Sequence, residues 1–305
     1  MPIIYETPSP HNFLWFGHLS YCDRNGPILN FIRSTLAPTT KRVKLVIPAI
    51  DGVVEEIPPT LQKLFITPAD IPTEQCIVGT ISTRNVSDPR IVLLPLDDES
   101  FMTGVVKAVE RRMVPPPWET RKPMLYWRGQ CSGGVFPTLR YRVVDALHTH
   151  PSADMRLIRD PEFPAERMGD MVMSDTAMFS DGRPLEEHMQ FKYTLIVDGS
   201  CIASSHQWMF ASGCVPLMVT HPGNNYWFKG FLRTGIHYVP IKYDLSDLVE
   251  TLEWLVANDA AAETIAANAM EFARTVLSAE FQQNYLRNEL ERALTLVTEI
   301  GQSIQ

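Results

Sequence analysis

Hydrophobic and polar residues along the chain form short apolar runs that alternate with amphipathic stretches. Continuous apolar runs of five to eight residues are typical of strands buried on both faces, as in parallel sheets. Stretches with apolar residues three and four positions apart are typical of helices that pack on one side. The sequence therefore predicts an α/β architecture. The predicted strands cover residues 43–50, 76–82, 90–96, 124–129, 155–160, 193–197, 215–219 and 237–241.

Helical spacing follows several of these strands. It appears at residues 100–113 and 138–150, between the strands that end at 197 and begin at 215, and almost continuously after Leu245. Residues 160–187 are polar and weakly periodic, which predicts a long loop with short helices.

Prolines divide the chain. Residues 114–123 contain four of them, which is typical of a linker. A chain of 305 residues also favours two cores over one. We expect an N-terminal lobe at 1–117, a second lobe at 118–280, and a C-terminal helix at 281–305 that packs back on the first lobe.

Charge and composition narrow the range of partners. A net charge of −8 and a pI near 5.5 argue against nucleic acid or an anionic membrane as the main partner. No apolar run reaches the roughly 18 residues of a membrane span, and the first residues lack the pattern of a secretory signal. The five cysteines are dispersed without a C-x-x-C pair, which predicts reduced thiols in a cytoplasmic protein.

Arginines and glycines surround the strand at 124–129. Arg128 and Gly129 end this strand, a glycine-containing loop follows, and Arg140 and Arg142 lie on the next helix. Guanidinium groups and exposed backbone N–H groups at such a position suit a pyrophosphate. The alternative is an ordinary strand–loop–helix connection with surface arginines.

A second candidate site follows the strand at 193–197. Asp198 and Gly199 end that strand, and small residues that include Ser204 and Ser205 open the next helix. Small residues let an anionic ligand approach a helix N-terminus. Helix capping by Ser204 explains the same pattern without a ligand. Gly213 is expected to stop that helix.

The carboxylates at positions 97–99 and at position 70 each have two interpretations, one functional and one structural. Asp97, Asp98 and Glu99 could bind a divalent cation together with phosphates. Because they directly precede a predicted helix, N-terminal capping is the better interpretation. Asp70 lies in a loop flanked by prolines, where a carboxylate is usually a solvated turn residue.

Three segments in this order resemble the family 90 glycosyltransferases. This CAP10-like group includes the protein O-glucosyltransferases and capsule xylosyltransferases, and the resemblance covers about residues 65–286. The segments are "YWRGQCSGG", "KYTLIVDGSCIASSHQWMFASGCVPLMV" and "HYVPIKYDLSDLVETLEWLVANDAAAETIAANAMEF".

The resemblance implies a GT-B-like fold, with two Rossmann-like lobes and the active site in the cleft between them. It implies an inverting transfer of a sugar, glucose or xylose, from a UDP-sugar to a hydroxyl of a glycan or glycoprotein, with no metal or other cofactor. Asp70, in an Asp-x-Pro context, matches the family's general base. The expected donor-binding residues are Arg128, Gly129, Arg142 or the nearby Arg140, Lys192, Asp198, Gly199 and Ser204.

The chain departs from the family at Ser205, where most members have an arginine that contacts the pyrophosphate. Either His206 takes its place, or Arg128 and Arg142 carry the whole charge. This departure motivates a second hypothesis, a non-catalytic nucleotide- or glycan-binding protein on the same scaffold. A third is a metal-dependent transferase that uses Asp97 and Asp98. The family's secretory features are absent, which favours a compact cytoplasmic protein of bacterial or viral type.

Overall fold

The computed structural model describes most of the second half of the chain and parts of the first. The described residues are 27–36, 44–46, 76–80, 89–95, 97–131, 137–158, 178–199, 202 and 205–303. The candidate residues Asp70 and Ser204 lie outside them. The chain forms two compact units, which are described separately below. Unit 1 comprises Met1–Gly104, Gly223–Gly230 and Ser278–Gln305, and unit 2 comprises Val105–Pro222 and Phe231–Leu277.

In the described residues of unit 1, three short strands form a parallel sheet and three helices accompany it. The strands, in the order β1-β2-β3, are β1 (Lys44–Val46), β2 (Cys76–Thr80) and β3 (Ile91–Leu93). The helices are α1 (Pro27–Leu36), α3 (Asp98–Thr103) and α10 (Ala279–Ser303). One side of α10 supplies Leu286, Leu290 and Ala293, spaced for a single helical face, to a core with Val92 and Phe101. Residues from both ends of the chain therefore build this unit.

Asp97 directly precedes α3 and caps it, and Asp98 is the first residue of that helix. Asp97 accepts a hydrogen bond from the Ser100 backbone N–H at 2.8 Å and from its hydroxyl at 2.6 Å. Asp98 accepts one from the Ile28 backbone N–H at 2.9 Å. The Asp97 contacts confirm the capping interpretation for that residue, whereas the Asp98 carboxylate binds the N-terminal turn of α1 instead.

The predicted helix at 100–113 is two helices. α3 ends at Thr103, and α4 (Val105–Glu110) begins after Gly104, which has a φ of 81°. The single-helix prediction was wrong because a glycine in this left-handed conformation ends a helix even where the apolar spacing continues across it. The two units also divide at this glycine, and residues 114–123 belong to unit 2.

Unit 2 is built on a parallel sheet of six strands in the order β6-β5-β4-β7-β8-β9. The strands are β4 (Lys122–Gly129), β5 (Ala153–Ile158), β6 (Phe179–Ser180), β7 (Phe191–Val197), β8 (Val215–Val219) and β9 (Val239–Pro240). The parallel α/β prediction is confirmed. β6 was missed, because two residues within a segment predicted to be a loop carry no periodic signal.

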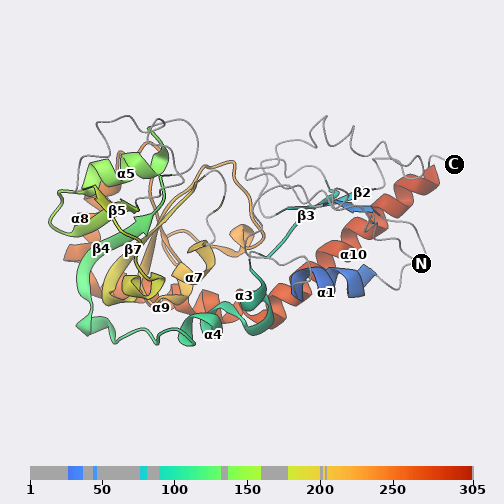
Figure 1. The fold of residues 1–305 in the computed structure, drawn as a ribbon, viewed down its shortest axis with the longest axis horizontal. Coiled ribbons are helices and arrows are strands. Elements are labelled where there is room, and N and C mark those ends of the chain that lie inside the picture. The colour runs from blue at the N-terminus through green and yellow to red at the C-terminus, as the bar shows by residue number, and fades with distance from the viewer. Residues whose placement is uncertain are drawn as a thin grey trace. The chain divides into compact units, whose positions relative to one another are not determined.

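Helices flank this sheet. They are α4, α5 (Leu139–Leu147), α7 (Ser205–Ala211), α8 (Leu248–Ala257) and α9 (Asp259–Thr275), with short 3₁₀ turns at Trp118–Thr120 and Leu185–Gln190. A further 3₁₀ turn, Lys229–Phe231, crosses the boundary between the two units in the sequence. The strand order reverses direction between β4 and β7, since β5 and β6 lie on one side and β8 and β9 on the other. Right-handed crossovers then send α5 and α7 to opposite faces, as Figure 1 shows.

Side-chain contacts agree with this arrangement. The Tyr193 hydroxyl on β7 donates to the Leu255 carbonyl of α8 at 3.1 Å. The next residue of β7, Thr194, is paired with Tyr126 of β4, so these two side chains lie on the same face of the sheet. On that face the Tyr126 ring contacts the His188 ring, which in turn contacts Trp208 of α7. Neighbouring residues of a strand point to opposite faces, so α8 and α7 cover different sides of the sheet. Within the described part of the chain, no helix has both the length and the apolar character of a membrane span.

Gly213, in the turn between α7 and β8, is required by the fold for two reasons. Its φ is 72°, and a Cβ added there would lie 2.6 Å and 2.9 Å from the guanidinium nitrogens of Arg121. Arg121 is buried and donates to the Gly213 carbonyl and, at 2.9 Å, to the Pro116 carbonyl. The predicted helix stop at Gly213 is confirmed.

We expect three glycine-to-alanine variants to separate backbone strain from steric clash. Gly182→Ala meets open space at ordinary φ and should change stability by less than about 0.5 kcal/mol. Gly235→Ala has positive φ but open space, and should cost about 1–2 kcal/mol. Gly213→Ala combines a positive φ with a steric clash, so its loss of unfolding free energy should be the largest of the three. Urea unfolding checks this order, and equal losses for Gly213→Ala and Gly235→Ala would contradict it.

Candidate active site

The reversal between β4 and β7 marks the place where this sheet can hold a ligand. In parallel sheets the loops after two strands on either side of such a reversal leave toward opposite faces and open a crevice at the carboxyl ends. Arg140 of α5 spans this point. Its guanidinium donates to the carbonyl of Gln130, just after β4, at 3.1 Å, and to that of Val197, the last residue of β7, at 3.4 Å. The structure thus brings Arg140 to the expected edge.

Asp198 directly follows β7, and its buried carboxylate lies at this edge of the sheet. Its carboxylate accepts a hydrogen bond from the His221 backbone N–H, after β8, at 2.8 Å. Its other oxygen lies 3.6 Å from Nε2 of His206, which is fully buried on α7. The carboxylate therefore joins the turns after β7 and β8 to α7. The burial of His206 against Asp198 supports a bracing role for this imidazole, and its contact with a phosphate stays a prediction.

Arg142, two residues after Arg140 on α5, reaches the loop after β9. Its guanidinium donates to the Asp244 carbonyl at 3.3 Å. In the same region the Tyr243 ring contacts the His221 ring edge to face, with centroids 5.5 Å apart. The Ser246 backbone N–H lowers the pKa of the Asp244 carboxyl. Arg140 and Arg142 thus place two guanidinium groups at one edge of the sheet.

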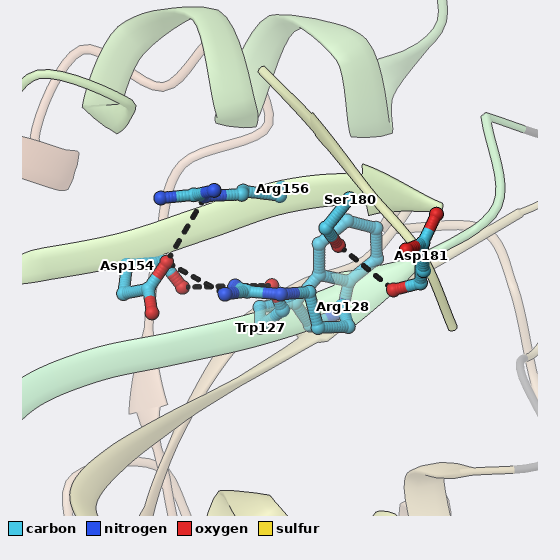
Figure 2. Close-up of polar contacts among 6 residues, drawn as sticks. All are labelled: Trp127, Arg128, Asp154, Arg156, Ser180 and Asp181. Atoms are coloured by element: carbon cyan, nitrogen blue, oxygen red, sulfur yellow. Dashed lines mark hydrogen bonds and ion pairs between the residues drawn. The ribbon is translucent and has the colours of Figure 1, made fainter. Parts of the chain in front are cut away.

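Arg128 is held by neighbouring protein groups, as Figure 2 shows. Its guanidinium donates to the Asp154 carboxylate and to the Asp154 carbonyl, each at 2.7 Å, and to the Trp127 carbonyl at 2.9 Å. It also lies over the Tyr126 ring at 4.3 Å, and only 7% of its side chain is exposed. Arg156 approaches the same carboxylate at 3.4 Å. A diphosphate at Arg128 would have to compete with these contacts.

The side chain of Trp127 accounts for the glycine at position 129. A Cβ at this position would overlap the indole ring of Trp127. A glycine here therefore lets the tryptophan fold over the end of β4, independently of any ligand.

Lys192 lies at the other end of β7. Its ammonium group donates to the Asp259 carboxylate, at the first residue of α9, at 2.6 Å. This contact lowers the pKa of Asp259. Lys192 is the second residue of β7 and Asp198 directly follows that strand, so the structure does not bring Lys192 to the carboxyl edge. Its observed role is to hold α9 to the sheet.

Gly199 and Ser205 are the remaining predicted residues that the structure describes. Gly199 follows Asp198, and Ser205 is the first residue of α7. The structure therefore has a half-buried serine at the position where the resemblance expects an arginine.

Sequence reasoning missed His221, Tyr243 and Asp244. All three follow predicted strands, and the rule that selected Arg128 and Asp198 could also have selected them. Cys131, near the end of β4, is a free and buried cysteine. Burial raises the pKa of its thiol, so this group is poorly suited to act as a thiolate nucleophile. In the described ranges, no three His, Cys, Asp or Glu side chains are grouped as metal ligands.

The comparison with known families decides the classification. The model of glycosyl transferase family 90 matches residues 101–297, which is more than half of the 305 residues. The chain belongs to glycosyl transferase family 90. The matched residues include the described edge from Arg128 to Asp244, and the resemblance inferred from the three sequence segments is confirmed.

Relatives of this family 90 chain include viral and bacterial proteins. An uncharacterized protein, 179R of Invertebrate iridescent virus 6, is 36% identical over 109 residues, which are 34% of this chain and 9% of 179R. The O-glucosyltransferase LpsA of Dichelobacter nodosus is 27% identical over 158 residues, which are 51% of this chain and 44% of LpsA. The chain therefore spans less than half of the length of these two relatives.

A solved structure shares the fold. HepE from Anabaena, crystallised with UDP-glucose, matches with a TM-score of 0.52 at 11% identity, over 87% of this chain and 75% of HepE. At this identity the match concerns the fold alone, and it confirms the predicted GT-B-like class.

Proposed function

We propose that this family 90 chain transfers a sugar from a UDP-sugar to an acceptor hydroxyl, with inversion at the anomeric carbon and without a metal ion. The observation that carries the proposal is the group at the strand reversal, where Arg140 and Arg142 lie at the same carboxyl edge as Asp198. Such an edge is where parallel sheets bind nucleotides, and guanidinium groups suit a diphosphate.

In the proposed reaction the acceptor oxygen attacks the anomeric carbon while the bond from that carbon to the diphosphate oxygen breaks. UDP leaves with the bonding electron pair, and the hydroxyl proton passes to a carboxylate base. Arg140 and Arg142 stabilise the negative charge that develops on the diphosphate. We assign the base to Asp70 on the strength of the family motif.

Glucose is the first sugar to test. LpsA is named as an O-glucosyltransferase, and HepE was solved with UDP-glucose. Xylose is second, because it differs from glucose by one hydroxymethyl group. We propose glycans or glycoproteins as acceptors, and cytoplasmic action.

A donor screen tests the proposal. We expect UDP and one UDP-sugar to raise the melting temperature, and that UDP-sugar to be hydrolysed slowly or transferred, with activity unchanged in EDTA. GDP-sugars serve as the control donors. Binding without hydrolysis or transfer would favour the non-catalytic alternative, which the serine at position 205 motivates. If no UDP- or GDP-sugar shifts the melting temperature, the nucleotide site is wrong.

A further inference from the structure

Several hydrogen bonds brace the loop after β9, residues 241–247. The Lys242 backbone N–H donates to the Asp247 carboxylate at 2.9 Å, and the Ser246 backbone N–H donates to the Asp244 carboxylate at 3.0 Å. Leu245 has a φ of 68°, in the left-handed region that leucine rarely adopts. A strained residue persists only where its surroundings fix it, and such residues cluster at ligand sites.

This loop presents one aromatic ring. The Tyr243 side chain is 43% exposed. Its ring is oriented by the edge-to-face contact with His221, at an interplanar angle of 85°. The His221 backbone N–H is in turn bound to Asp198. The exposed ring is therefore fixed with respect to the carboxylate at the end of β7.

The same loop is joined to the arginines of α5. Arg142 donates to the Asp244 carbonyl, next to Tyr243, while Arg140 donates to the Val197 carbonyl, next to Asp198. An exposed aromatic ring and two guanidinium groups thus lie along one sheet edge. A planar heteroaromatic base joined to a diphosphate needs this combination, because bases stack on aromatic rings and phosphates pair with arginines.

We propose that Tyr243 stacks on the base of the nucleotide, so that residues 241–247 form the wall of a nucleobase pocket. The inference rests on the proposed nucleotide-sugar site and adds to it the residue that binds the base. The hydrogen bond from Arg142 to the loop and the contact between the His221 and Tyr243 rings hold the tyrosine in place before the ligand arrives, which lowers the entropic cost of binding.

Calorimetric titration of the full chain with UDP and with inorganic pyrophosphate tests the proposal. Tyr243→Ala should weaken UDP binding about tenfold or more, because stacking on a base is typically worth about that factor. The UDP affinity of Tyr243→Phe should stay within about twofold of that of the wild-type chain, since the ring is retained. Pyrophosphate binding should not change in either variant. Trp254→Ala is the matched control, since Trp254 is a similarly exposed aromatic residue on α8.

Tyr243→Leu gives a second measurement, since leucine keeps bulk without a π face and guards against a folding defect in the alanine variant. Unchanged UDP affinity in Tyr243→Ala and Tyr243→Leu would overturn the proposal. So would unchanged UDP affinity with weakened binding of UDP-glucose, because the ring would then face the sugar. If the unchanged chain does not bind UDP, the proposed function fails, and this inference fails with it.

Discussion

Replacement of Asp70 by asparagine is expected to reduce sugar transfer by roughly 100- to 10,000-fold, the usual contribution of a general base. Asparagine has nearly the same shape as aspartate but cannot accept the proton of the acceptor hydroxyl. UDP binding should be unchanged, because the residues proposed to bind the diphosphate lie on α5. Single-turnover transfer and UDP titration measure the two effects separately.

Asp97→Asn is the matched control for this experiment. Asp97 caps α3, and asparagine caps helices about as well as aspartate, so the variant should fold and transfer sugar normally. Normal transfer by Asp70→Asn would show that the base is another group. Loss of activity in Asp97→Asn, together with inhibition by EDTA, would instead support the metal-dependent alternative.

Replacement of Asp198 by alanine should lower the free energy of unfolding by about 2–3 kcal/mol, because it removes the acceptor of the His221 backbone N–H in a buried setting. UDP affinity should fall with it, since the turns after β7 and β8 lose the group that joins them. Asp198→Asn keeps a carbonyl oxygen for this hydrogen bond and should recover most of both losses. Urea unfolding and UDP titration follow the two quantities.

Asp145→Ala, at an exposed position on α5, provides the control and should change stability by less than about 0.5 kcal/mol. A folded Asp198→Asn variant that binds UDP as poorly as Asp198→Ala would contradict the positioning role. The negative charge itself would then act on the substrate.

The strands that shape the site were predictable from sequence. β7 and β8 are buried along their whole length, and most of their residues are apolar. The predicted strands at 193–197 and 215–219 agree with the observed Phe191–Val197 and Val215–Val219 within two residues. The strand order was not predictable in this way. It depends on how strands far apart in the chain pair, and it decides which loops meet.

Side-chain roles were harder to predict, because they depend on partners distant in the sequence. Arg128 was correctly placed at the end of a strand, but its partner Asp154 is 26 residues away and no local pattern links them. Lys192 belongs to a segment that resembles the family motif, yet a motif does not reveal which end of the strand faces the ligand. Tyr243 follows a predicted strand, but its contact with the His221 ring, 22 residues away, is not visible in the sequence.

The composition of unit 1 has a consequence for the order of events during protein synthesis. Val92 and Phe101 pack against Leu286 and Leu290, nearly 200 positions later. A ribosome that extends the chain at about 5–20 residues per second delivers every strand of unit 2 before it delivers α10. The nascent chain can therefore complete the six-stranded sheet first, while the apolar face of α3 stays uncovered until α10 has been synthesised. Chaperones that shield nascent chains are expected to protect the first unit for longest.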